Sequence, residues 1–137
     1  MNTKRTWTRP EITAVIGLLT SASGIAVLWA AGLEFPFYPP PGMLIMTAGA
    51  LAFTLMRPRL RYAALVPALL GLSGVVGFVM EAIIGGGIGL ANLTGDAGTA
   101  PIFGQALQQL GVVIAGVAGV VAIRSRAARD SRVSQPA

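Results

Sequence analysis

The residue with the clearest chemical potential is Glu81, the one ionisable side chain inside an otherwise uncharged apolar stretch of this 137-residue chain. A bare carboxylate in hydrocarbon costs several kcal/mol, so we expect Glu81 to be protonated or hydrogen-bonded within the protein. Such a carboxylate can bind a proton or cation on a transport path, or it can lock two helices together. Because no second acid, histidine or lysine is available for a relay, we favour the locking role and keep transport as the alternative.

Glutamines near the start of the last apolar stretch are the predicted partners of Glu81. They lie three or four residues apart, which places them on one helix face. The last stretch is expected to run antiparallel to the one that holds Glu81, so the amide N–H groups come to a similar depth and can donate to the carboxylate. The candidate intramembrane polar site is therefore Glu81, Gln105, Gln108 and Gln109.

Other chemistry is poorly represented in this chain. It contains no cysteine or histidine, which excludes disulfides, thiolate metal sites and the commonest general base. The sequence patterns of P-loop nucleotide-binding proteins, zinc peptidases and serine hydrolases are also missing. We therefore expect no catalytic residues, no metal and no cofactor, and we do not expect an enzyme.

The elements that must position these residues are membrane helices. Hydrophobic residues make up 54% of the chain and charged residues 11%, which is too little ionic surface for an ordinary soluble domain. The sequence predicts an all-α integral membrane protein with four transmembrane helices in an up-down bundle. This is one membrane domain, residues 1–137, with a basic tail at 124–137. The predicted spans are 12–33, 39–56, 62–84 (or 66–88) and 102–123, each near the ~20 residues that cross a bilayer.

The depth of Glu81 depends on where the third span begins. A start at Leu60 to Tyr62 puts Pro67 inside the helix and Glu81 about 12 Å from the bilayer midplane. A start at Val66 makes Pro67 the first helical residue and leaves Glu81 about 6 Å from the midplane.

The basic residues predict the orientation. All ten Lys and Arg fall before the first predicted span, between the second and third, or after the fourth. The positive-inside rule then places both termini and the 57–61 turn in the cytoplasm, in a plasma (inner) membrane. Frequent arginine, alanine and glycine are typical of high-GC bacterial genomes. At the start of the first span, Glu11 is expected to complement the positive end of the helix dipole.

Arginines at the cytoplasmic ends are predicted to contact anionic lipid headgroups, each gaining about 1 kcal/mol. The predicted set is Arg57, Arg59, Arg61, Arg124 and Arg126. Nucleic-acid binding is not expected, because the basic residues form short clusters rather than a continuous groove.

Small residues recur at helical spacing in the last two spans, as is typical of membrane helices whose backbones approach closely. The predicted packing residues are Gly71, Gly74, Gly77, Gly111, Ala115 and Gly119. This pattern does not reveal whether the partner helices belong to this chain, to a second copy or to another membrane protein.

Two classes of function fit these observations. The favoured one is an accessory or structural subunit of a larger bacterial membrane complex. The alternative is a small proton- or cation-coupled transporter or channel that uses Glu81. Small multidrug transporters are also four-helix chains of this size, but they carry their essential acid within the first helix, and residues 12–33 contain none.

Overall fold

The computed structural model describes residues 6–84 and 87–133, and within them the chain is helical with no strand. Lys4, Arg5 and the last four residues of the predicted tail lie outside the described residues. The helices run in chain order as follows: α1 (Arg9–Ala30), α2 (Pro41–Met56), α3 (Leu65–Ile84), α4 (Ile88–Thr94) and α5 (Thr99–Val133).

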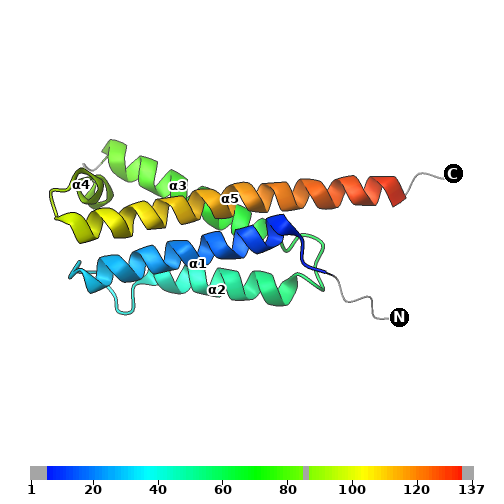
Figure 1. The fold of residues 1–137 in the computed structure, drawn as a ribbon, viewed down its shortest axis with the longest axis horizontal. Helices are drawn as coiled ribbons and strands as arrows, with labels where there is room; N and C mark the ends of the chain where they lie inside the picture. Colours follow the sequence, from blue (N-terminus) through cyan, green and yellow to red (C-terminus); the bar gives the residue numbers. More distant parts are fainter. Residues whose placement is uncertain (1–5, 85–86, 134–137) are drawn as a thin grey trace.

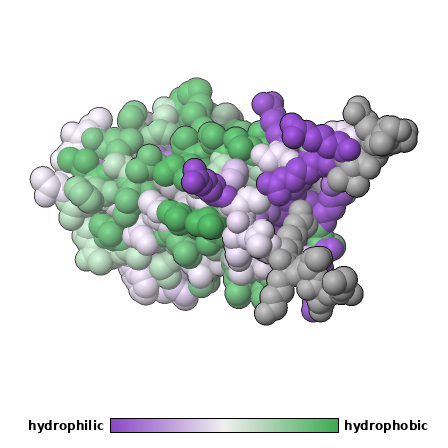
Figure 2. Space-filling view, turned by 45° about the vertical axis from the view of Figure 1, so that its right-hand side comes forward, coloured by the Kyte–Doolittle hydropathy of each residue, from purple (hydrophilic) through white to green (hydrophobic). Residues whose placement is uncertain are grey.

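Helices α1, α3 and α5 are long and apolar enough to cross a membrane, so this is a helical membrane protein. Helix α2 is apolar but has only 16 residues, or about 24 Å at 1.5 Å per residue. Its role as a fourth span therefore stays a prediction. Figure 2 shows apolar side chains over most of the visible face and most of the hydrophilic ones gathered at one end.

Helices α1, α2, α3 and α5 alternate in direction, so the start of α1 and the end of α5 lie at the same end of the bundle (Figure 1). We call this the basic end, defined by Arg9, Arg57, Arg61 and Arg126. The opposite end, which carries the 31–40 connection and α4, is called the loop end.

Two helix starts differ from the predicted boundaries in ways that matter for the polar groups. Helix α1 begins three residues before the predicted span, at Arg9, which brings Glu11 into its first turn. Helix α3 begins at Leu65, close to the later of the two predicted starts, with Pro67 in the first turn where a missing N–H leaves no bond unmade.

The last two helices were only partly predicted. Helix α5 continues ten residues beyond the predicted span end, to Val133, and its 35 residues extend about 52 Å. Helix α4 lies within a glycine-rich connection where no helix was predicted. It ends at Thr94 and is capped by Gly95, whose φ of 90° is a left-handed conformation that glycine adopts without strain.

Small residues let α1 and α3 approach α5 closely. For most of the predicted packing residues, the partner helix therefore belongs to this chain. A Cβ added to Gly17 of α1 would lie 2.5 Å from the backbone nitrogen of Ala115, and one added to Gly119 would lie 2.6 Å from that of Ala68. The other close approaches are Gly111 to Ser21, Gly71 to Gly116 and Gly74 to the Val112 side chain. Gly77 differs, because a Cβ there would meet nothing within 4 Å.

Replacing glycine by alanine should therefore have opposite effects at two positions. Gly17→Ala should lower the free energy of unfolding by about 1–3 kcal/mol, because the new methyl group overlaps the α5 backbone. Gly77→Ala has room and should raise it by up to about 1 kcal/mol through helix propensity. Denaturation by SDS of the detergent-purified protein, followed by circular dichroism, measures both. Equal effects would contradict the close contact of α1 and α5.

Candidate functional site

A polar cavity of about 480 Å³ lies at the loop end, among α3, α4, α5 and the connection after α1. Figure 1 shows α3 diverging from α5 at this end, with α4 near the ends of both. All four predicted site residues line this cavity: Glu81, Gln105, Gln108 and Gln109. The structure therefore brings together side chains that lie on two different helices.

Helix α4 supplies the hydrogen bonds that were predicted to run directly between Glu81 and the glutamines. The Glu81 carboxylate accepts a hydrogen bond from the backbone N–H of Gly89, at 3.2 Å. The Gln105 side-chain oxygen accepts one from the Asn92 amide, at 3.4 Å. Among the described residues no hydrogen bond joins Glu81 to a glutamine, because α4 takes up both groups.

Two glycines pack closely against Glu81 where α4 begins. A Cβ on Gly87 would overlap the Glu81 side chain, and one on Gly89 would lie 3.2 Å from its Oε2 atom. The backbone at the start of α4 therefore packs directly against the carboxyl group.

The cavity carries a second carboxylate that sequence reasoning missed. Glu34, from the connection after α1, lines the same cavity as Glu81, and Asn92 and Ser73 add further polar groups. No basic residue belongs to the described lining. Two carboxylates and several amides favour a cation or a hydrogen-bond donor. Nothing in the sequence spacing of Glu34 links it to Glu81, which lies 47 residues further along the chain.

A second polar site lies at the basic end, and its centre is Glu11. The Glu11 side chain is buried, with 1% of the residue exposed. Its Oε2 atom accepts a hydrogen bond from Nε of Arg57 at 2.8 Å, and its Oε1 atom accepts one from Nε of Arg126 at 3.1 Å and another from Nη2 of the same guanidinium. We call these three residues the Glu11 network.

The Glu11 network also binds the backbone of neighbouring segments. The Thr8 N–H donates to Glu11 at 3.0 Å, and Nη1 of Arg126 donates to the carbonyl of Arg61 at 2.9 Å. Arg57 lies over the ring of Trp7, with 4.2 Å from its guanidinium carbon to the ring centroid. One carboxylate thus connects the start of α1, the end of α2, the turn before α3 and the last part of α5.

This burial changes the lipid-contact prediction for two arginines. Arg57 and Arg126 are 4% and 8% exposed and point inward to Glu11, which cannot be buried as a charge without such partners. The prediction of headgroup contact is therefore kept for the exposed Arg59, Arg61 and Arg124. Arg61 also forms an exposed ion pair with Asp130, at 3.2 Å. In the sequence, the only sign of the Glu11 network is that Glu11 lies at the start of the first predicted span, on the side where the basic residues gather.

The two polar sites are separated by apolar packing. Along α5, Val112 and Ala115 lie between the glutamines and Arg126, and both are buried in one cluster with Leu18, Ala22, Met46 and Ala50. The polar cavity at the loop end is therefore not joined to the Glu11 network by polar side chains of this cluster.

Removing the buried acid should be far more costly than removing an exposed one. Glu11→Ala leaves two buried guanidinium groups without their anion and should lower the free energy of unfolding by about 3–5 kcal/mol. Asp130→Ala breaks only the exposed pair with Arg61 and should change it by less than about 1 kcal/mol. Thermal and SDS denaturation of the purified variants compare the two. A Glu11→Ala variant as stable as Asp130→Ala would show that the network does not hold the basic end together.

Comparison with protein-family models, with curated proteins and with solved structures found no match to this chain. Any assignment of function therefore depends on the geometry of the polar cavity and of the helices around it.

Proposed function

We propose that this protein is a non-catalytic, multi-pass accessory or structural subunit of a larger bacterial membrane complex. The single observation that supports the proposal most is the polar cavity beside a poorly covered face of α3. Lipid tails offer no hydrogen bonds to the amides of this cavity, so a protein partner with a polar side chain would stabilise it.

Helix α3 is the long helix least covered by the rest of the chain. In an apolar stretch of 18 residues of α3, 17% of the stretch is buried inside the protein, whereas the corresponding share for α1 is 44%. Ser73 and Gly77 are exposed on α3 and line the polar cavity. Small residues at such a position allow a second helix backbone to approach closely.

The side chains of Gln108 and Gln109 are half-buried in the same cavity and form no hydrogen bond to other described residues. A partner helix that lies along Ser73 and Gly77 and carries a hydrogen-bonding side chain would reach these amides. This favours an apolar membrane helix of another subunit as the partner, with the interaction centred on the α3 face of the cavity.

The proposed orientation has both termini in the cytoplasm of a plasma membrane, with α2 as a fourth span. Support comes from the charge distribution: every described arginine lies at the basic end, and Glu34, Glu81 and Asp96 lie towards the loop end. The positive-inside rule favours the cytoplasm for the arginine-rich side.

Filling the space at Gly77 should remove the partner without unfolding the protein. We expect tagged wild-type protein, extracted in mild detergent, to co-purify with larger membrane subunits, which mass spectrometry identifies. The amount of these subunits should be at least tenfold lower with Gly77→Leu. Val79→Phe is the matched control, because it adds as many side-chain carbons to an exposed α3 residue outside the cavity lining. If both variants keep the same co-purifying subunits as wild type, the accessory proposal is wrong at this face.

A second candidate is a cation- or proton-coupled transporter or channel. The observation that favours it is that Glu34 and Glu81 line one cavity with no basic residue in the described lining. Carboxylates in such surroundings attract cations, and a carboxyl group at membrane depth can exchange a proton.

This second candidate predicts a flux that depends on Glu81. Vesicles reconstituted with wild-type protein should show proton or cation flux well above protein-free vesicles, and Glu81→Gln should abolish it, because the amide cannot ionise. Equal flux in wild-type and Glu81→Gln vesicles would rule out a transport function that uses Glu81. A loss of partner subunits in Glu81→Ala with unchanged flux would instead favour the accessory role.

A further inference from the structure

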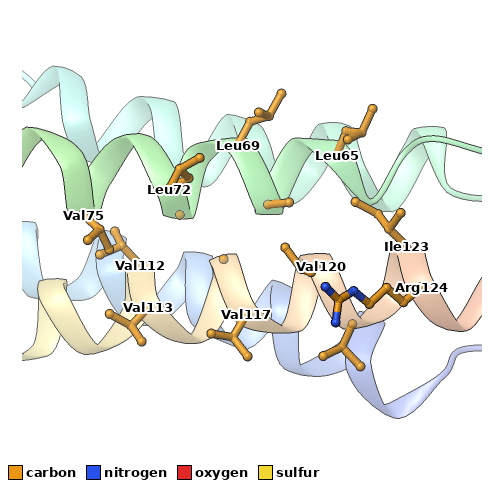
Figure 3. A pocket seen from close by; sticks show the side chains of 14 residues that line it. Leu65, Leu69, Leu72, Val75, Val112, Val113, Val117, Val120, Ile123 and Arg124 are labelled. Carbon is orange, nitrogen blue, oxygen red and sulfur yellow. The ribbon is translucent and has the colours of Figure 1, made fainter.

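An apolar groove of about 690 Å³ runs between α3 and α5, and it ends at one charged side chain (Figure 3). Leucines of α3 form one wall and valines of α5 form the other, and the charged residue is Arg124. The labelled wall residues in Figure 3 are Leu65, Leu69, Leu72, Val75, Val112, Val113, Val117, Val120 and Ile123.

The groove has the length of one membrane leaflet. On α5 it extends from Val112 to Arg124, about 18 Å, and on α3 from Leu65 to Val75, about 15 Å. Half of a hydrocarbon core of ~30 Å is about 15 Å. A groove that begins at the basic end and stops near mid-membrane fits an acyl chain, whereas a spanning partner helix would need contacts along the full length.

Arg124 gives the groove a charged end. Its side chain is exposed and has no hydrogen bond or ion pair with the residues that the structure describes. Figure 3 shows it directed back along α5 towards Val120. Among the other arginines of the basic end, Arg126 binds Glu11 and Arg61 pairs with Asp130. A guanidinium at an apolar surface binds phosphate oxygens well, because its planar N–H groups match their geometry.

We propose that this groove is a binding site for one phospholipid with a net negative headgroup. The phosphate is bound by Arg124, and one acyl chain lies between α3 and α5. A negative headgroup is favoured over a zwitterionic one because the groove offers no anion to pair with a choline ammonium group. The groove shares no lining residue with the polar cavity, so the proposal does not depend on either proposed function.

The test uses native mass spectrometry of the purified full-length chain, with phosphatidylglycerol and phosphatidylcholine of identical acyl chains as probes. Wild type should retain one phosphatidylglycerol in preference to phosphatidylcholine. Arg124→Gln should lower that retention about fivefold, as expected for loss of one basic contact to an anionic lipid. Arg129→Gln is the matched control, because it removes the same charge from another exposed position of α5 outside the groove and should leave retention unchanged.

A second pair of variants tests the acyl chain. Val120→Trp fills the groove while keeping Arg124 and should also remove the bound lipid. Val79→Trp adds the same bulk to α3 outside the groove, at a residue of similar exposure (45% against 43% for Val120), and should not. Unchanged melting temperatures confirm that each variant is folded.

Four results would overturn the proposal. Equal retention of the two lipids, or equal losses in Arg124→Gln and Arg129→Gln, would mean general attraction to a basic surface. Unchanged retention in Val120→Trp would place the lipid elsewhere. A dimer that Val120→Trp dissociates, with no retained lipid in wild type, would assign the groove to a second copy of this chain.

Discussion

The structure depends on the burial of one carboxylate at the basic end. Glu11 is almost fully enclosed, and a charge in that position is tolerated only when opposite charges and hydrogen bonds replace the lost water. The two guanidinium groups that provide them come from Arg57 and Arg126, 46 and 115 residues further along the chain. This requirement draws together the end of α2 and the last part of α5 around the first turn of α1.

Close backbone packing continues this arrangement towards the loop end. Helix α5 is the central element, since small residues let both α1 and α3 lie against it. Where the glycine contacts with α3 stop, that helix diverges and the polar cavity opens (Figure 1). The molecule thus has a firmly held basic end and a more open loop end, and its candidate functional groups are at the open end.

Much of this could be predicted from hydropathy and charge, because the bilayer strongly constrains helix length and the side on which arginine gathers. The late start of α3 follows from Pro67, and the strip around Gly111 and Ala115 follows from small-residue spacing. Glu81 and the three glutamines predicted near it line one cavity. Among the described residues, the direct hydrogen bonds predicted between Glu81 and the glutamines are absent, because α4 provides the partners instead. Helix α4 was not predicted, because a seven-residue helix in a glycine-rich connection gives too weak a local sequence signal.

The Glu11 network escaped sequence reasoning for a different reason. Arginines next to a membrane span are explained by topology alone, so nothing in their spacing distinguishes Arg126, which turns inward, from Arg124, which stays exposed. Two residues along a helix correspond to a rotation of about 200°, and this places neighbouring arginines on opposite faces. Only the packing of α5 against α1 decides which of the two is buried.

The separation of Glu11 and Arg126 in the chain has a consequence for biosynthesis. The ribosome releases the first helix long before it has made the residue that completes its surroundings, and contacts between such distant positions form late in folding. Until Arg126 has been made, Glu11 has only Arg57 of its two arginine partners. Closure of the bundle around Glu11 therefore has to wait until α5, which carries Arg126, has been made.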